Sequence, residues 1–395
     1  MCIRDSLRLY LGKGEEGDED YYPGYNGSAK VVTSFGQNHL NAINPNTGRI
    51  HTQYWQLGAD TGRMSCGSKD NNNDLAKVKG LPINPSSKQK KEGKACPYPN
   101  MQQLPSDPVT RACFTAMKGN KWCSCDYSAI ESRLGADIYQ EKSMIEEFLY
   151  GSGDMHSLCA YMVYTDIIPR DTPIKDIKKL YPHQRKEVKS IEFSQQFGGS
   201  EYAIQNAMGC TLEKAIEFKN AYAKGFPGIS KYKEKASKIV RTKGYILLCP
   251  ITGHKTYCEG FNRWMERQKS YTQDFWEEYR TLHKPYKDEV YQEVRKHFQE
   301  VAKFDRKSLN SPTQGTGAII LKDSQIAIFN WVVDNGYFGK CLLCNLTHDE
   351  CNWEYPEELE EFPKIVSKTM EKSAAKYCKS VPIPAEATVG DCWIH

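Results

Sequence analysis

The amino-acid sequence predicts an α+β fold, because a few strand-like runs stand among many helical stretches. Trp122 to Tyr127 is a short apolar run with the length and composition of a buried strand. Lys340 to Trp353 predicts a hairpin, since two apolar runs flank a polar tip. The other periodic stretches repeat apolar residues at helical spacing, and this mixture is typical of an α+β protein.

The helices are predicted from apolar spacing and from the glycines and prolines that bound it. Gly151-Ser152-Gly153 ends the first helix, Gly198-Gly199 ends the second, and Pro227-Gly228 separates the next two. Residues 261–307 alternate aromatic and charged side chains, which predicts a helical insertion. The main helices are expected at Glu131 to Leu149, Pro182 to Phe197, Leu212 to Phe226, Tyr232 to Thr242 and Gln314 to Val333.

Length and composition indicate a globular protein with two or three subdomains. The chain has 395 residues, of which 39% are hydrophobic and 26% charged, and its net charge is +4. That charge is compatible with a nucleic-acid partner but too small to indicate one by itself. The sequence contains no run of about eighteen apolar residues and no secretory signal, so we expect no membrane span and a cytoplasmic location.

Two cysteine pairs among the fifteen cysteines have metal-like spacing, Cys123-x-Cys125 and Cys341-x-x-Cys344. Both pairs fall in apolar strand-like runs, where neighbouring side chains alternate between faces. Without a secretory signal, we expect reduced thiols that serve as small apolar core residues. A structural zinc site is the alternative interpretation.

Two carboxylates lie where predicted strands meet polar segments. Asp126 is at the end of the first strand, and Asp349 is at the tip of the hairpin within His348-Asp349-Glu350. Each is by itself typical of a helix cap or a turn. If the strands are neighbours, however, the two anions converge and need a cation between them. Mg²⁺ is the natural candidate, because it binds one or two carboxylates together with substrate phosphates, as two-metal phosphoryl transfer requires.

Four side chains recur every four residues in the helix predicted at 182–197 and therefore lie on one of its faces: Arg185, Lys189, Phe193 and Phe197. Two cations followed by two aromatic rings suit a nucleotide, because the cations bind phosphates and the rings contact sugar and base. The alternative interpretation is an amphipathic helix with buried phenylalanines and surface cations.

Taken in order, the three clusters resemble motifs A, B and C of family A DNA polymerases. Asp126 to Arg133 resembles motif A, Arg185 to Gly198 resembles motif B, and His348-Asp349-Glu350 resembles motif C. Shorter segments also resemble this family, namely Thr61-Gly62-Arg63, Asn100 to Pro105, Asp154-Met155-His156 and Asn310 to Gly315. The resemblance runs from about residue 40 to the C-terminus.

The resemblance implies a DNA polymerase that adds deoxynucleoside triphosphates to a primer 3′-hydroxyl by two-metal phosphoryl transfer. It implies two Mg²⁺ ions, replaceable by Mn²⁺, with Asp126 and Asp349 as ligands and Lys189 and Glu350 as further catalytic residues. The side chains that would contact the nucleotide are Arg185, Lys189, Phe193, Phe197, Glu131 and His156. Those that would contact primer–template DNA are Arg63, Arg111, Asn310, Gln314 and His348.

The resemblance also implies a right-hand fold with an antiparallel-sheet palm, helical fingers and a largely missing thumb. Its parts are a leader or thumb remnant at 1–39, a first palm part at 40–150 with a lysine-rich insertion at 67–99, fingers at 151–260, a helical insertion at 261–309 and a second palm part at 310–395. The insertions suggest a phage-type enzyme and the short leader a fragment, in a bacterial or phage-infected cell. A processivity factor is compatible with the sequence but not identifiable from it.

The sequence departs from the family pattern in motif B, where Phe197 replaces the usual Tyr and Glu192 the usual Asn. Other functions stay open. A single-subunit RNA polymerase shares the hand-like fold, although it commonly has Tyr in place of Phe193 and lacks the gate against a ribose 2′-hydroxyl that Glu131 implies. A non-catalytic nucleic-acid-binding remnant and a metal-binding hydrolase are the further alternatives.

Overall fold

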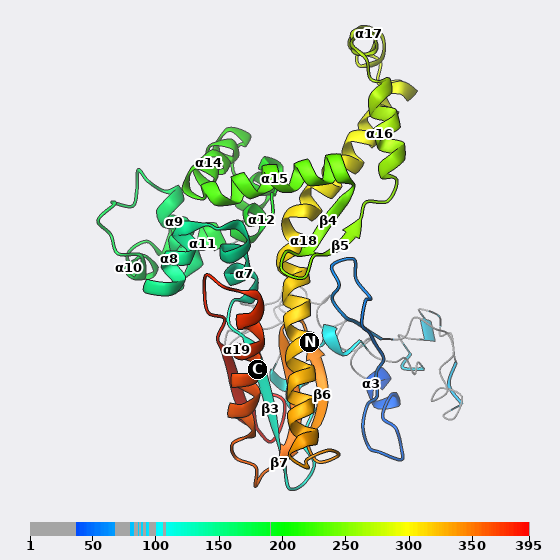
Figure 1. Cartoon of the computed structure of the whole chain (residues 1–395), viewed down its shortest axis with the longest axis vertical. Helices are drawn as coiled ribbons and strands as arrows, with labels where there is room; N and C mark the ends of the chain where they lie inside the picture. Colours follow the sequence, from blue (N-terminus) through cyan, green and yellow to red (C-terminus); the bar gives the residue numbers. More distant parts are fainter. Residues whose placement is uncertain are drawn as a thin grey trace, which may run out of the picture. The chain divides into compact units, whose positions relative to one another are not determined.

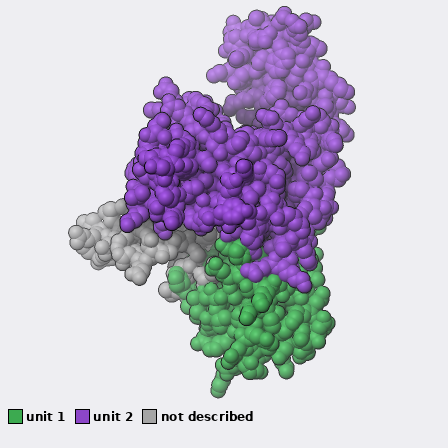
Figure 2. Space-filling view, turned by 60° about the vertical axis from the view of Figure 1, so that its left-hand side comes forward, with its two compact units in different colours: residues 1–128, 321–370, 384–395 green, residues 129–320, 371–383 purple. Residues whose placement is uncertain are grey.

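The structure is a computed structural model that describes residues 37–67, 80–82, 86, 88–89, 92–94, 100–105, 108–189 and 191–394. Most of the predicted leader at 1–39 and of the predicted insertion at 67–99 lies outside these residues. The chain forms two compact units (Figure 2). Unit 1 comprises residues 1–128, 321–370 and 384–395, and unit 2 comprises residues 129–320 and 371–383.

Unit 1 is built on a four-stranded antiparallel sheet in the order β6-β7-β3-β8 (Figure 1). Its strands are β3 (Asn120–Tyr127), β6 (Leu342–Thr347), β7 (Glu350–Pro356) and β8 (Ala385–Gly390). Both strand regions expected from the sequence are present, and every residue of β7 is buried. Strand β8 was not predicted. It pairs with β3 along Trp122 to Tyr127, so β3 is central and has partners on both sides.

The sheet of unit 1 is packed on both faces. The indole of Trp353 donates to Gln325 at 3.2 Å and lies edge-on to Phe362, while the Tyr127 hydroxyl donates to the carbonyl of Met370 at 2.8 Å. A second cluster contains Cys66, Met101, Leu104, Trp122 and Trp393. The described cysteines are free thiols and most are buried, Cys123, Cys125 and Cys351 completely.

The smaller elements of unit 1 are α3 (Gln37–Asn41), β1 (Tyr54–Trp55), β2 (Ser65–Cys66), η2 (Met101–Gln103) and α6 (Pro108–Ala112). Helix α19 (Phe362–Tyr377) begins in unit 1, and its last turns belong to unit 2. None of the described helices is long and apolar enough to cross a membrane.

Unit 2 is mainly helical. Its first helices are α7 (Ile130–Tyr139), α8 (Lys142–Tyr150), α9 (Met155–Val163), α10 (Ile174–Leu180), α11 (Pro182–Lys189), α12 (Glu192–Gln196), α13 (Glu201–Met208), α14 (Leu212–Gly225) and α15 (Pro227–Lys243). Helix α9 is central among them, because it packs against α8, α10, α11 and α14 (Figure 1). This packing explains why α9 has an apolar sequence and buries most of its residues.

Two helices predicted as continuous are interrupted. The expected helix at 131–149 is divided into α7 and α8, because Gln140 adopts left-handed backbone (φ 51°) and Glu141 begins the next helix by accepting from the amide of Ser143. The expected helix at 182–197 ends at Lys189 and resumes at Glu192, where an acidic residue suits a helix N-terminus. Phe197 lies just beyond α12, so the predicted four-residue stripe does not lie on one helix.

Helix α18 is longer than predicted. It runs from Glu289 to Asp334 over 46 residues, and its last residues, from Leu321, belong to unit 1. Pro312 lies inside it and removes one backbone hydrogen bond, yet the helix continues because Leu309, Ser311 and Thr313 around it are buried. The predicted insertion at 261–307 comprises α16 (Phe261–Ser270), α17 (Gln273–Glu278), the π-helical turn η3 (Tyr279–His283) and the first turns of α18.

A hairpin of β4 (Tyr245–Cys249) and β5 (His254–Tyr257) completes unit 2 and was not predicted. It lies against α18 at Gly315, where a Cβ atom would come within 2.4 Å of the carbonyl oxygen of Leu248. Only glycine therefore allows this close approach of helix and strand. The packing explains a glycine inside the segment Asn310 to Gly315 that the sequence had singled out.

Candidate active site

The predicted carboxylates of unit 1 come together at one end of the sheet. Asp126 is paired in register with Glu350 across β3 and β7, and Asp349 immediately precedes Glu350 in the two-residue turn between β6 and β7. His348 forms the first residue of that turn in left-handed backbone, with φ 54°. A non-glycine residue in this conformation is uncommon and is concentrated at functional sites. The fold thus gathers three acidic side chains from two strands and a turn.

The acids of this cluster repel one another. Burial raises the pKa of Asp126 to about 7, and the charges of Asp349 and Glu350 add to the effect, while the amide of Tyr127 and Arg111 oppose it. Two carboxylates whose charges disfavour one another are suited to a bound cation, because the cation relieves the repulsion. Hard oxygen ligands of this kind fit Mg²⁺. The described residues contain no group of three or more His, Cys, Asp and Glu side chains arranged to hold a metal by themselves.

Glu350 is held from several directions. Its carboxylate accepts from the indole of Trp393 at 2.7 Å and from the amide of Asn352 at 3.0 Å, and Arg111 lies 3.8 Å away. The guanidinium of Arg111 also stacks over the ring of Trp393 at 4.7 Å and is buried. Arg111 was predicted to contact DNA. In this position it forms an ion pair with Glu350, so we expect it to fix the carboxylate cluster.

In unit 2, two residues that were predicted to bind the nucleotide contact acidic side chains. Arg185 of α11 donates to Asp154 in bidentate fashion, at 2.9 and 3.1 Å. Asp154 also caps α9 by accepting from the amide and hydroxyl of Ser157 at 3.2 and 2.8 Å. Burial acts to raise the pKa of Asp154, but hydrogen bonds from Arg185 and Ser157 outweigh it and lower this pKa below its usual value. The guanidinium therefore has one defined orientation.

The second of these residues is His156, on the first turn of α9. Its Nδ1 contacts a carboxylate oxygen of Glu192, which begins α12 and whose side chain is only 6% exposed. Lys189, the other predicted cation beside Arg185, is exposed at the end of α11. Glu131 lies in the first turn of α7, directly after the left-handed residue Ala129. The side chain of Phe193 lies outside what the structure describes.

The predicted DNA contacts fall in both units. In unit 2, Gln314 is half-buried on α18, and one turn earlier the side-chain oxygen of Asn310 is buried without a hydrogen-bond partner among the described residues. In unit 1, Arg63 ends a turn that Lys322 holds, because the Lys322 ammonium donates to the carbonyls of Gln56 and Gly62 at 2.6 and 2.8 Å. Lys322 was not predicted, since a lone lysine on a helix gives no recognisable signal.

The acidic partners Asp154 and Glu192 were also not predicted to have these functions. For Asp154 a signal existed, because Asp followed three residues later by Ser at the start of an apolar stretch indicates a helix cap. For Glu192 the sequence showed only a departure from the family pattern. Its contact with His156, 36 positions away, depends on the packing of α9 and could not be read from local sequence.

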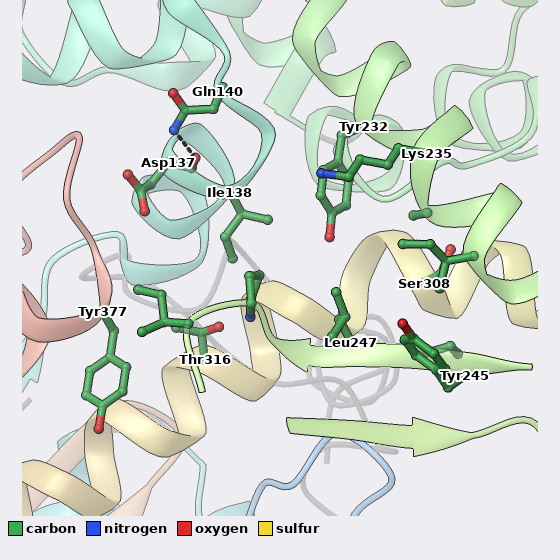
Figure 3. Close-up of a pocket in the computed structure, with 15 residues that line it drawn as sticks. Asp137, Ile138, Gln140, Tyr232, Lys235, Tyr245, Leu247, Ser308, Thr316 and Tyr377 are labelled. Atoms are coloured by element: carbon green, nitrogen blue, oxygen red, sulfur yellow. Dashed lines mark hydrogen bonds between the residues drawn. The ribbon is translucent and has the colours of Figure 1, made fainter. Parts of the chain in front are cut away.

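Unit 2 also contains a cavity of about 230 Å³ (Figure 3). Its lining includes the apolar side chains Ile138 and Leu247 and the polar side chains of Lys235 and Tyr232. None of the described residues predicted for nucleotide or DNA contact lines it. The cavity is therefore separate from the candidate site.

Comparison with known proteins agrees with this architecture. The family model for DNA polymerase family A matches residues 20–395. A DNA polymerase I of Caldicellulosiruptor bescii is 28% identical over 365 residues, which are 92% of this chain and 34% of that relative. A thermostable DNA polymerase I of Thermus caldophilus is 26% identical over 353 residues, or 89% of this chain and 33% of the relative. This chain spans about a third of the length of these relatives.

The fold also matches a solved structure, the POL domain of Pol1 from M. smegmatis in complex with DNA primer-template and dNTP. The TM-score is 0.65 at 20% sequence identity, and the match covers 100% of this chain and 61% of that chain. The sheet with its carboxylates and the helical unit with its cations thus define an α+β protein with the right-hand polymerase fold. The chain belongs to DNA polymerase family A.

Proposed function

We propose that this chain is a polymerase core that copies a DNA template by adding deoxynucleoside triphosphates to a primer 3′-hydroxyl. The observation that carries the proposal is the gathering of Asp126, Asp349 and Glu350 at one end of the palm sheet. Family membership supports it, and so do the relatives named DNA polymerase I. The structural neighbour bound primer-template DNA and dNTP, which are the partners we propose for this chain.

Asp126 and Asp349 are the residues that would hold two Mg²⁺ ions, or Mn²⁺ in their place. Mutual repulsion and burial make these carboxylates a poor arrangement without a cation and a favourable one with it. When bound, Mg²⁺ would make the primer 3′-hydroxyl a better nucleophile and offset the charge of the triphosphate and the leaving pyrophosphate. Glu350, fixed by Trp393 and Asn352, would add its negative charge to this cation site.

We assign the triphosphate to Arg185, His156 and Lys189. A planar guanidinium held in one orientation can present its remaining N–H groups to phosphate oxygens without losing much side-chain entropy on binding. Lys189 is exposed and would donate a proton to the leaving pyrophosphate. Phe193 and Phe197 would contact sugar and base, and Glu131 would exclude a ribose 2′-hydroxyl.

We assign primer–template contacts to Arg63, Gln314, Asn310 and His348. The side-chain oxygen of Asn310 supports this, because it is buried with no hydrogen-bond partner in the described part of the chain, and such an acceptor is expected to meet a ligand or water. The hydrogen bond from Lys322 to the carbonyl of Gly62 likewise supports this assignment, because it holds the turn that precedes Arg63. Contacts of this kind in the minor groove read acceptors common to all correct base pairs.

Primer extension with Asp126→Asn tests the function. We expect extension to fall on the order of 10³-fold or more, because a metal ligand is lost, while primer–template affinity stays within about twofold. The matched control is Asp391→Asn, which removes an exposed carboxylate paired with Lys121 in the same unit and should leave extension unchanged.

Two results would contradict the proposal. Full extension by Asp126→Asn would exclude the metal assignment. Ribonucleotides incorporated as efficiently as deoxynucleotides by the wild-type chain would instead favour an RNA polymerase, and an inactive wild-type chain that still binds DNA would favour a non-catalytic remnant.

A further inference from the structure

Glu192 is a buried acid whose carboxylate has one polar partner among the residues that the structure describes. The residue is 5% exposed, and its carboxylate contacts Nδ1 of His156. Burial raises the pKa of the Cys159 thiol, and the charge of Glu192 raises it further. Burial also raises the pKa of Tyr222, followed by the effects of Cys159 and then Glu192. A neutral thiol and a neutral phenol balance little of a carboxylate's charge. The imidazole is therefore the group that compensates Glu192, as a buried acid requires.

The contact fixes how the His156 ring is turned. Nδ1 and Nε2 lie on different sides of an imidazole ring, so a ring held at Nδ1 by a buried carboxylate directs Nε2 away from it. The exposures agree, because the His156 side chain is 23% exposed and that of Glu192 is 6% exposed. His156 thus has a buried, anchored edge and a second edge that is open to a ligand.

The ion pair of Asp154 and Arg185 is a second acid–base contact made by α9, and here the acid is on the α9 side. Asp154 on the α9 side holds Arg185 of α11, whereas Glu192 of α12 holds His156 of α9. The two carboxylates therefore cross-link α9 to α11 and α12 reciprocally. Each cross-link leaves a cationic or N–H-bearing group in a defined orientation within unit 2.

We propose that Glu192 is a positioning residue for the triphosphate: its carboxylate accepts from Nδ1–H of His156, and in the imidazolium form of the ring Nε2–H donates to a phosphate oxygen. This inference rests on the proposed function. The opposing effect is repulsion between the Glu192 carboxylate and a triphosphate. The acid is buried behind the imidazole, so we expect the gain from orienting the His156 ring to exceed the repulsion between Glu192 and the triphosphate. A carboxylate orients a metal-binding histidine in the same way.

Steady-state primer extension of Glu192→Asn and His156→Gln tests the inference. Glu192→Asn carries the residue usual in the family, so it should fold. We expect it to raise KM for dNTP roughly tenfold, the factor given by one hydrogen bond of about 1.4 kcal/mol, with kcat changed less than about twofold. The inhibition constant of inorganic tripolyphosphate should rise by the same factor, and adding His156→Gln should produce no further increase.

The matched control is Glu201→Gln, which removes a less buried acid paired with Lys219 in the same unit and should leave KM unchanged. Independent effects of Glu192→Asn and His156→Gln, or a lower KM in Glu192→Asn, would overturn the inference. Nitrogen-15 NMR of the His156 ring provides a second test: Nδ1 must show a hydrogen bond that Glu192→Asn removes. This signal stays readable if the chain has no polymerase activity, so failure of the proposed function and failure of this inference are distinguishable.

Discussion

The acids of unit 1 and the basic residues of unit 2 differ in the partners that they face. Asp126 faces two further carboxylates, and its pKa rises to about 7 because burial and repulsion outweigh the opposing effects of the Tyr127 amide and Arg111. Arg185 and His156 are each matched by one acid, and the pKa of Asp154 falls below its usual value. The first region is thus an array of mutually repelling acids, for which we propose a bound cation, whereas in the second Arg185 and His156 each have an acidic partner. We expect substitutions in the first to change kcat and those in the second to change KM.

The largest effect is expected from Asp349→Asn. It should lower kcat on the order of 10³-fold, with KM for dNTP within about twofold, because the substitution removes the metal ligand proposed above and leaves the basic residues of unit 2 in place. Quenched-flow primer extension at varied dNTP separates the two parameters. A large rise in KM with unchanged kcat would contradict the expectation that the acids of unit 1 act on kcat.

Glu354 is an acid of unit 1 that, unlike Asp126, is paired with a cation. The Glu354 side chain is fully buried and accepts from Arg49 at 2.9 and 3.0 Å and from Asn120 at 2.6 Å. Burial acts to raise the pKa of Glu354, but these hydrogen bonds lower it below its usual value. Because the folded pKa is below the unfolded one, the stabilisation is complete above the unfolded pKa and is lost as pH falls through the folded pKa.

Glu354→Gln should therefore lower the free energy of unfolding of unit 1 by about 3 kcal/mol at pH 7, since it breaks a buried ion pair. Denaturant melts at pH 7 and pH 3 measure this. The difference between wild type and variant should shrink at the lower pH, and an unchanged difference would show that the carboxylate charge is not what stabilises the pair.

A smaller effect is expected from Arg185→Lys. Lysine keeps the charge but cannot make the bidentate contact with Asp154, so KM for dNTP should rise about tenfold while kcat changes little. Lys186→Arg, one position away on the exposed side of α11, is the matched control. Equal KM values for wild type and Arg185→Lys would mean that charge alone, and not orientation, serves the nucleotide.

Local sequence predicted the elements that carry their own signal. The strand at Trp122 to Tyr127 and the hairpin around His348 to Glu350 are present, as are helices near 212–226 and 314–333. The breaks at Gln140 and between Lys189 and Glu192 were missed, because apolar spacing continues across both while the backbone does not. Strand β8 was missed because half of its residues are exposed and only the free edge of β3 makes it a strand.

The sequence by itself determined the family pattern, the α+β class and the identity of Asp126, Asp349, Arg185 and His156 as candidate site residues, because these depend on residue type and order. Only the tertiary structure decided which acids these residues face. Asp154 and Arg185 are 31 positions apart, and Glu350 and Trp393 are 43. Contacts over such separations depend on how helices and strands pack, and packing is a property of the whole chain that no local pattern encodes.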